Sequence, residues 1–274
     1  MTLLKPTLLL LFLSASVYAQ KLPNVQQGGL SAPANVKIDG KAAEWGPHLQ
    51  AYNKAVDLSY SLANDAKNLY LIVQTDKPRI VEKIIGVGVT LTINKNGAKD
   101  YKNKTNAELT YPLLDVSTGI RILAAAGIQS DNVMFYSRIK ESPISNLVVN
   151  ENQTDSLIDV ANKTLKTASK MFKIKGFNGL PDTLSIYNEH DIITAIDYNK
   201  NGTYTYELQI PLKLLGIAGQ KNPFSYSIKL RNRLVNKKQG IMTITYEDED
   251  GNTINLNQDL DADTDFWGDY TLAK

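Results

Sequence analysis

Cysteine is absent from this chain of 274 residues. Its absence excludes disulfide bonds, thiolate metal ligands and a lipid-modified cysteine, so we do not expect a lipoprotein. Stability must come from a packed core instead, and a chain of this length can bury one. Histidine is nearly absent too: the chain has only His48 and His190, which are not at the spacing of metal ligands.

An excess of charge of one sign is also lacking. The formal net charge is +2 at pH 7, and Lys237–Lys238 is the one adjacent pair of basic residues. Nucleic-acid binding usually needs a basic face, so we expect no nucleic-acid partner. After the first residues, no apolar run is long enough to cross a bilayer, so we expect no membrane span. The sequence gives no indication of the oligomeric state.

The first residues have the layout of a secretory signal peptide. Lys5 supplies a positive charge, Leu8–Leu13 is a short apolar run, and Ala19 is a small residue at the expected cleavage site. The run is far shorter than the ~20 residues that a transmembrane helix needs. We therefore expect residues 1–19 to be removed on export to the periplasm or to the outside of the cell.

Four segments alternate between apolar and polar residues with a period of two: Val56–Leu62, Ile85–Ile93, Tyr204–Ile210 and Phe224–Leu230. This alternation is typical of strands with one face buried and the other in water. Several such strands predict an all-β fold, an antiparallel β-sandwich of the immunoglobulin or jelly-roll type. The predicted core includes Leu58, Tyr60, Leu71, Val89, Leu91, Tyr206, Leu208, Ile228 and Leu230.

One segment has helical spacing instead. Leu157, Ala161, Leu165, Ala168 and Phe172 recur at this spacing, which predicts a helix from Asp155 to about Lys170 packed outside the sandwich. The other connections are turns and one very short helix. The expected positions are a hairpin turn at Asn64–Asn68, a tight turn at Asn201-Gly202, a strand end at Pro211 and the short helix at Leu212–Leu215.

The remaining segments complete the domain organisation. Residues 20–33 are interpreted as a polar lead-in, and residues 34–274 as a single domain. Within it, Tyr101–Asn152 has no clear periodicity and is interpreted as an insertion of irregular strands and loops. Gly86 and Gly88 lie in an alternating pattern, which favours close packing of strands over a phosphate-binding loop.

An acidic segment near the end of the chain is the candidate metal site. Asp259, Asp261, Asp263 and Asp265 alternate with other residues, and four such carboxylates repel one another unless a positive charge compensates them. Calcium at Asp261, Asp263 and Asp265 would supply that charge. The alternative, which we favour, is a solvated acidic loop. We otherwise expect no cofactor.

No pattern in the chain indicates a catalytic site, so we do not expect an enzyme. No serine lies in a nucleophile-elbow pattern, and Glu189-His190-Asp191 is interpreted as a solvated turn before a strand. The segment Asp197–Leu208 begins like an EF-hand loop, but Leu208 stands where the bidentate glutamate is needed. It is therefore better explained by a β-hairpin.

Tyrosine is the abundant aromatic residue, with fourteen tyrosines against two tryptophans. Sugar rings stack on exposed aromatic faces, so this bias is compatible with a carbohydrate ligand. The tyrosines outside the predicted core strands are the candidate ligand-binding residues: Tyr101, Tyr111, Tyr136 and Tyr187.

Four stretches together resemble the family 9 carbohydrate-binding modules. They are VKIDGKAAEWG, with Asp39, Gly40 and Trp45, the hairpin LSYSLANDAKNLYLIVQTD, the run NGTYTYELQIPLKLLGI, and the close DFWGDYTLAK. The resemblance implies an antiparallel β-sandwich with carbohydrate as a possible partner. Trp45 matches the tryptophan of the opening motif, and we expect it to be buried and structural, plugging one end of the sandwich. Trp267 lies in the terminal motif.

These observations favour a non-catalytic, secreted binding protein for a glycan or another envelope component. One alternative is a structural envelope protein without a small ligand. Less favoured are a glycoside hydrolase with two carboxylates and a haem-binding sandwich. The last would draw its ligands from Met134, Met171, Met242, His48 and His190.

Overall fold

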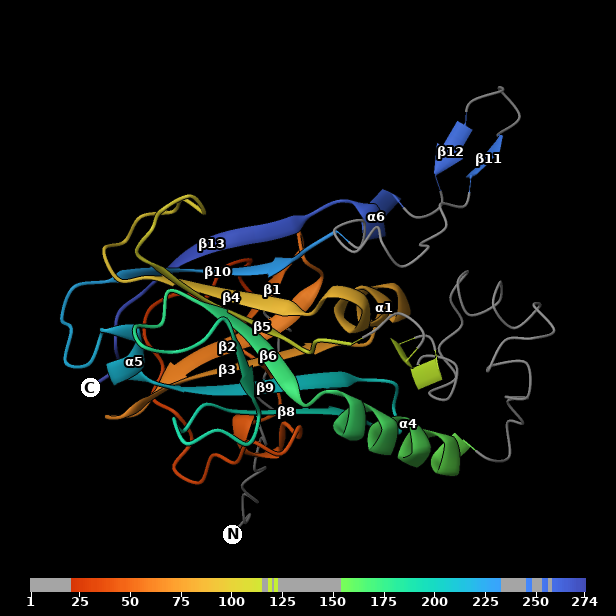
Figure 1. Cartoon of the computed structure of the whole chain (residues 1–274), viewed down its shortest axis with the longest axis horizontal. Coiled ribbons are helices and arrows are strands. Elements are labelled where there is room, and N and C mark those ends of the chain that lie inside the picture. The colour runs from red at the N-terminus through yellow and green to blue at the C-terminus, as the bar shows by residue number, and fades with distance from the viewer. Residues whose placement is uncertain are drawn as a thin grey trace, which may run out of the picture.

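The protein forms two packed antiparallel sheets (Figure 1). The structure, a computed structural model, describes residues 21–114, 118–119, 121–122, 154–232, 245–247, 253–255 and 258–274. Every pairing between the described strands of the two sheets is antiparallel. The predicted β-sandwich is therefore confirmed.

The first sheet has five strands and the second has six. In spatial order the five-stranded sheet contains β1 (Ala51–Asn53), β2 (Leu58–Asn64), β3 (Asn68–Thr75), β9 (Tyr204–Pro211) and β8 (Ile193–Tyr198). In spatial order the six-stranded sheet contains β13 (Thr264–Tyr270), β10 (Phe224–Leu230), β4 (Val89–Asn94), β5 (Asn106–Tyr111), β6 (Met171–Lys175) and β7 (Thr183–Ser185). A separate ribbon pairs β11 (Thr245–Glu247) with β12 (Thr253–Asn255).

The core lies between the two sheets and is built from every second residue of their strands. All of the predicted core residues are buried: Leu58, Tyr60, Leu71, Val89, Leu91, Tyr206, Leu208, Ile228 and Leu230. Two tyrosine hydroxyls inside this core are paired with each other, since the Tyr60 and Tyr226 hydroxyl oxygens are 2.8 Å apart. The period-two pattern therefore identified the inward faces correctly.

The predicted helix is present as α4 (Thr154–Ala168) and packs outside the sandwich against the edge strand β8. Its Asn162 amide pairs with the backbone of Tyr198 in both directions, each at 2.8 Å. Buried Ile158, Ala161 and Leu165 form its apolar face. The helix thus covers a strand edge that would otherwise expose unpaired backbone groups.

The other short elements also agree with the sequence. The turn at Asn64–Asn68 joins β2 to β3, β9 ends at Pro211, and α5 (Leu212–Leu215) follows directly. A single-turn helix, η1 (Ala43–Trp45), and α6 (Gln258–Asp261) complete the described elements apart from α1. Figure 1 shows α5 at one end of the sheets and α4 at the other.

The predicted strand Ile85–Ile93 is wrong in its first half. Ile85 to Val87 belong to a helix, α1 (Pro78–Val87), and β4 starts only at Val89. Proline suits the first turn of a helix, and the buried residues Val81, Ile84 and Ile85 recur at helical spacing. Ile85 and Val87 fit both the helical spacing of α1 and the period-two alternation of a strand. The alternation alone therefore could not show where the helix ends and the strand begins.

Gly88 marks the change from helix to strand. Its φ of +75° favours glycine, and a Cβ there would lie 2.7 Å from the Pro112 carbonyl oxygen. Gly88 therefore lies close to the chain that follows β5, but it ends a helix and does not lie within a strand as expected. Gly86 has no such contact, because it lies within α1 with open space around its Cα. The strand-packing interpretation of Gly86 is wrong.

The interpretation of Tyr101–Asn152 as irregular is wrong at its start. Residues 106–111 form β5, a central strand that pairs with β4 on one side and β6 on the other. Only Leu109 and Tyr111 are large apolar residues in this strand, so its alternation was too weak to detect. Most of residues 115–153 lie outside the described part of the chain. Among the described helices, none is long and apolar enough to cross a membrane.

Candidate functional site

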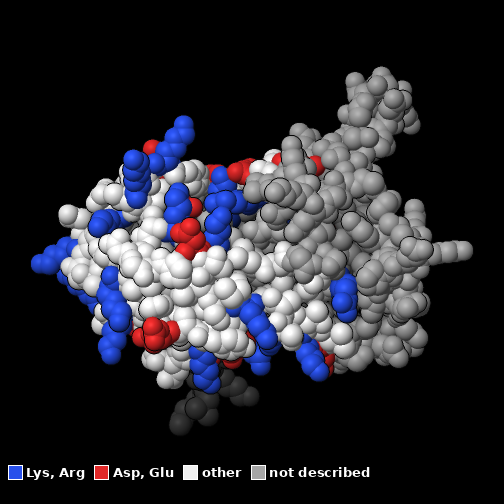
Figure 2. Space-filling model, in the orientation of Figure 1, with Lys and Arg blue, Asp and Glu red and all other residues white. Residues whose placement is uncertain are grey.

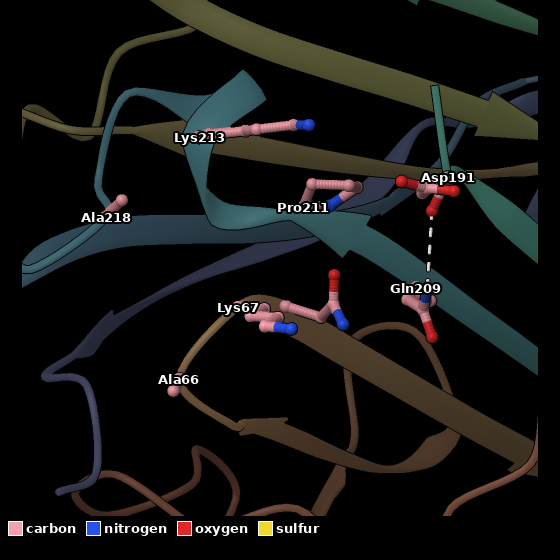
Figure 3. A pocket seen from close by; sticks show the side chains of 8 residues that line it. Ala66, Lys67, Asp191, Gln209, Pro211, Lys213 and Ala218 are labelled. Atoms are coloured by element: carbon pink, nitrogen blue, oxygen red, sulfur yellow. Dashed lines mark hydrogen bonds between the residues drawn. The ribbon is translucent and has the colours of Figure 1, made fainter. Parts of the chain in front are cut away.

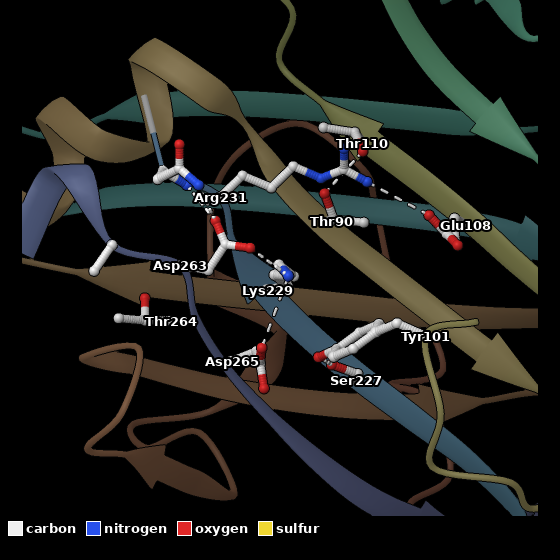
Figure 4. A network of polar contacts seen from close by, with 12 residues as sticks. Thr90, Tyr101, Glu108, Thr110, Ser227, Lys229, Arg231, Asp263, Thr264 and Asp265 are labelled. Carbon is white, nitrogen blue, oxygen red and sulfur yellow. Dashed lines mark hydrogen bonds and ion pairs between the residues drawn. The ribbon is translucent and has the colours of Figure 1, made fainter. Parts of the chain in front are cut away.

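Three of the predicted site residues meet on the outer side of the six-stranded sheet. They are Tyr101, Asp263 and Asp265 (Figure 4). Polar residues point outward here because the apolar residues of β10 and β13 point into the core. We call this surface the polar face. It consists of Tyr101, Glu108, Ser227, Lys229, Arg231, Asp263, Asp265 and Trp267.

Lys229 is the centre of the polar face. Its Nζ atom lies 2.6 Å from a carboxylate oxygen of Asp263 and 3.9 Å from one of Asp265. The same atom lies 4.7 Å from the ring centre of Tyr101, within the range of a cation–π contact. One ammonium group therefore fixes two carboxylates and one aromatic ring relative to each other.

Asp263 is held from a second side by Asn232. The Asn232 backbone and side-chain N–H groups donate to one Asp263 oxygen at 2.7 and 2.6 Å. Burial tends to raise the pKa of Asp263, but the hydrogen bonds from Lys229 and Asn232 outweigh it and hold the pKa below its usual value. Asp263 is therefore ionised at neutral pH.

Tyr101 and Trp267 form a partly exposed aromatic pair. Their ring centres are 4.9 Å apart with 45° between the ring planes. The Tyr101 hydroxyl is 2.5 Å from the Ser227 hydroxyl, which fixes the ring over β10. Burial and the nearby Asp265 charge raise the pKa of Tyr101, so its hydroxyl stays protonated. The pair thus offers rigid apolar surface next to fixed charges.

The charged network continues across the sheet to β5. Glu108 lies 3.5 Å from an Arg231 nitrogen and 3.3 Å from Lys175 Nζ. Figure 2 shows the Lys and Arg side chains next to the Asp and Glu side chains in the middle of this side of the molecule. Among the described residues, the buried Nε of Arg231 and the buried hydroxyl of Thr92 have no hydrogen-bond partner.

The predicted metal residues are only partly brought together. Asp261 ends α6, while Asp263 and Asp265 share Lys229. Lys229 thereby supplies the compensating charge for which calcium was considered at Asp263 and Asp265. The described residues contain no group of three or more histidine, aspartate or glutamate side chains placed to hold a metal ion.

The other predicted ligand-binding tyrosines do not join the polar face. The expectation that Tyr111 is exposed is wrong: it is only 2% exposed, its ring stacks on Tyr206, and its hydroxyl donates to the Ser169 carbonyl at 2.9 Å. It is buried because it belongs to the undetected strand β5. Tyr187 is 76% exposed, on the connection between β7 and β8. Tyr136 lies outside the described residues.

The opening motif has a partner that the sequence did not reveal. Trp45 donates its indole N–H to Glu207 at 2.8 Å, and the backbone N–H groups of Gly40 and Asp39 donate to the other Glu207 oxygen at 2.8 and 3.0 Å. Gly40 has a φ of +86°, and a Cβ there would lie 2.8 Å from Asp197 Cβ, so the loop requires glycine. Burial raises the pKa of Glu207 to about 6, despite these three donors.

Trp45 is buried, as predicted, but its position differs from the expectation. It does not plug an end of the sandwich. It packs on the outer side of the five-stranded sheet against Leu49, Ala63, Tyr70 and Ile72. No sequence signal marked Glu207, because an outward-facing glutamate in an alternating strand is indistinguishable from a solvated one.

Comparison of the chain with models of known protein families finds no match, and comparison with curated protein sequences finds none either. The resemblance to family 9 carbohydrate-binding modules therefore depends on the four sequence stretches alone.

Proposed function

We propose that the protein is an exported, non-catalytic carbohydrate-binding protein that holds its ligand on the polar face. The observation that carries the proposal is the partly exposed pair Tyr101–Trp267 beside the Lys229–Asp263–Asp265 network. An aromatic ring offers a flat apolar surface to the C–H face of a sugar ring. Adjacent charged groups exchange hydrogen bonds with sugar hydroxyls.

The fixed geometry of these groups favours binding. Lys229 is held by two carboxylates, and the Tyr101 ring is held by Ser227. A ligand would therefore immobilise few side chains on arrival, which reduces the entropic cost of association. The face carries three carboxylates against two basic side chains, and this small excess of negative charge suits a neutral sugar better than an acidic one.

The protonation states support binding rather than hydrolysis. A glycoside hydrolase needs one carboxylic acid that still carries its proton near neutral pH. The pKa of Asp263 is lowered, so it does not supply that proton. A raised pKa occurs at Glu207, but this side chain is fully buried beneath Trp45 on the other sheet.

Affinity electrophoresis in gels containing neutral polysaccharides tests the proposal. We expect retardation of the wild-type protein and its loss in Trp267→Ala and Tyr101→Ala. Tyr101→Phe keeps the ring and loses only the Ser227 contact, so most of the retardation should remain. Tyr187→Ala removes an exposed tyrosine away from the polar face and serves as the matched control.

Tryptophan fluorescence gives an independent readout, because the chain has only two tryptophans. Sugar binding should change the emission of partly exposed Trp267 and leave that of buried Trp45 unchanged, as a Trp267→Phe variant would verify. If no polysaccharide in a broad panel retards the protein, or if retardation survives Trp267→Ala, the proposal is wrong. Failure across the panel would favour a structural envelope role.

A further inference from the structure

A second polar site lies on the outer side of the five-stranded sheet, at the end near α5 (Figure 3). It is an open pocket of about 350 Å³. Its lining includes Lys67, Asn68, Asp191, Gln209, Pro211 and Lys213. These residues come from the β2–β3 turn and the start of β3, from β9 and α5, and from the connection between β7 and β8.

The pocket walls are fixed by hydrogen bonds that backbone N–H groups donate. The Leu212 N–H donates to the Lys67 carbonyl at 2.8 Å, which ties the β2–β3 turn to the start of α5. Asp65 accepts the backbone N–H groups of Lys67 and Asn68, both at 2.7 Å, which closes the turn. The two lysines therefore project from a rigid frame on two sides of the pocket.

The charges in this pocket differ from those on the polar face. Lys67, Lys213 and Asp191 are exposed, and none makes an ion pair within the described part of the chain. On the polar face, by contrast, Lys229 is bound to carboxylates. The pocket thus presents two ammonium groups and one carboxylate to solvent, with a local excess of positive charge.

The two amide side chains contribute acceptors. Asn68 donates its Nδ2 to the Tyr70 hydroxyl at 3.2 Å, and Gln209 donates its Nε2 to the Asp191 carbonyl at 3.3 Å. Their side-chain oxygens remain as acceptors, beside the Asp191 carboxylate. The pocket therefore combines donors for an anionic group with acceptors for hydroxyl groups, and the Pro211 ring adds a small apolar surface.

We propose that this pocket binds an acidic sugar residue. Lys67 and Lys213 would attract its anionic group from two sides of the pocket, while Asp191 and the amide oxygens of Asn68 and Gln209 would accept its hydroxyl groups. A lysine acts as a point charge on anionic oxygens, so the shared chemistry includes a sugar carboxylate and a sugar phosphate. The site is separate from the polar face and does not depend on the function proposed for it.

Calorimetric titration of the full chain at low ionic strength tests the proposal, with oligogalacturonate as the probe. We expect binding that weakens about twofold to fivefold in Lys67→Gln or Lys213→Gln, as for exposed ion pairs, and further in the double variant. Added salt should weaken it as well. Lys54→Gln, at the opposite end of the same sheet, is the matched control and should change nothing.

Two further ligands identify the chemistry. Uncharged oligogalactose should bind at least fivefold more weakly than oligogalacturonate, and inorganic phosphate should bind more weakly than the acidic sugar. In Asp191→Asn the ratio of galacturonate affinity to phosphate affinity should fall. The charged carboxylate that accepts hydrogen bonds from the sugar hydroxyl groups is replaced by a neutral amide. Trp267→Ala should leave all of these affinities unchanged.

Three outcomes would overturn the proposal. The first is equal affinity for the acidic and the uncharged sugar. The second is unchanged affinity in the double lysine variant, whose melting temperature should match that of the wild type because both side chains are exposed. The third is inorganic phosphate binding as tightly as galacturonate, which would show an anion site without sugar recognition.

Discussion

The two outer sides of the sandwich are built differently. The side of the five-stranded sheet around Trp45 is apolar and lies under the N-terminal part of the described chain, where Leu30, Val36 and Ile38 pack against it. The buried carboxylate of Glu207 on this side accepts hydrogen bonds from three N–H groups of the chain. The side of the six-stranded sheet carries the polar face, with paired charges and partly exposed rings.

Each outer side carries one of the two tryptophans, so a comparison of Trp45 with Trp267 shows how the two sides differ in function. Trp45 is 9% exposed and bound to Glu207, whereas Trp267 remains partly exposed beside Tyr101. The same residue type therefore stabilises the fold on one sheet and remains accessible on the other. What separates the two roles is whether another segment of the chain covers the ring.

The largest expected effect is on stability when Trp45 is truncated. Trp45→Ala should lower the free energy of unfolding by about 3–5 kcal/mol, as large buried aromatic residues do. Trp267→Ala should cost about 1 kcal/mol or less, because its ring is already partly in water. Urea denaturation of both variants measures the difference. Equal losses would mean that the two sides do not differ in the way described.

The next effect is a pH dependence from Glu207. Its folded pKa of about 6 lies above the ordinary value of 4.5. The protonated form therefore favours folding below pH 4.5, and this contribution is lost as pH rises through the folded pKa, by about 2 kcal/mol in total. Between pH 4.5 and 7, the stability of the wild type should fall relative to that of Glu207→Gln.

The absolute stability of Glu207→Gln does not decide this prediction, because the amide also loses one acceptor for the three N–H groups. The decisive quantity is the difference in slope between wild type and variant over that pH range. Parallel stability curves would show that the donors hold the Glu207 pKa at its ordinary value.

A smaller effect is expected when the polar face loses its central charge. Lys229→Met should lower the free energy of unfolding by about 1 kcal/mol or less, since partly exposed ion pairs contribute little. Carbohydrate binding should nevertheless weaken clearly, because Tyr101, Asp263 and Asp265 lose their common contact. A large loss of stability with unchanged binding would contradict this prediction, because the polar face would then stabilise the fold and would not bind the ligand.

The smallest expected effect concerns calcium. Because Lys229 already compensates Asp263 and Asp265, the melting temperature of the wild type should not change on addition of calcium or chelator. In Lys229→Met the two carboxylates lose that compensation, so added calcium should raise the melting temperature slightly. A clear rise in the wild type would mean that the aspartates bind calcium.

Much of the fold could be predicted from single segments. Tyr206, Leu208, Ile228 and Leu230 were placed in the core because alternation in a strand assigns every residue to one of two sides. Prediction failed where the alternation fitted two structures or was too weak to recognise. Ile85 fits both a helix and a strand, and β5 has few large apolar residues. Tyr111 was therefore expected to be exposed although it is buried.

The candidate site was predictable only in parts. Tyr101, Asp263 and Asp265 were identified, but as members of two unrelated groups, a set of tyrosines and an acidic loop. Lys229, which joins them, and Trp267, whose ring contacts that of Tyr101, were not expected to be there. The reason is the strand order: β10 lies between β13 and β4, and local pattern does not specify which strands become neighbours.

The sequence by itself determined which faces of the strands are apolar, where α4 and α5 form, and that β9 ends at Pro211. These properties depend on neighbours a few residues apart, whose backbone geometry is repetitive. Tertiary structure alone decided that Glu207 binds Trp45 across 162 positions and that Tyr101 meets Ser227 across 126. Such contacts depend on how whole sheets pair and pack, so the same glutamate could equally have been solvated.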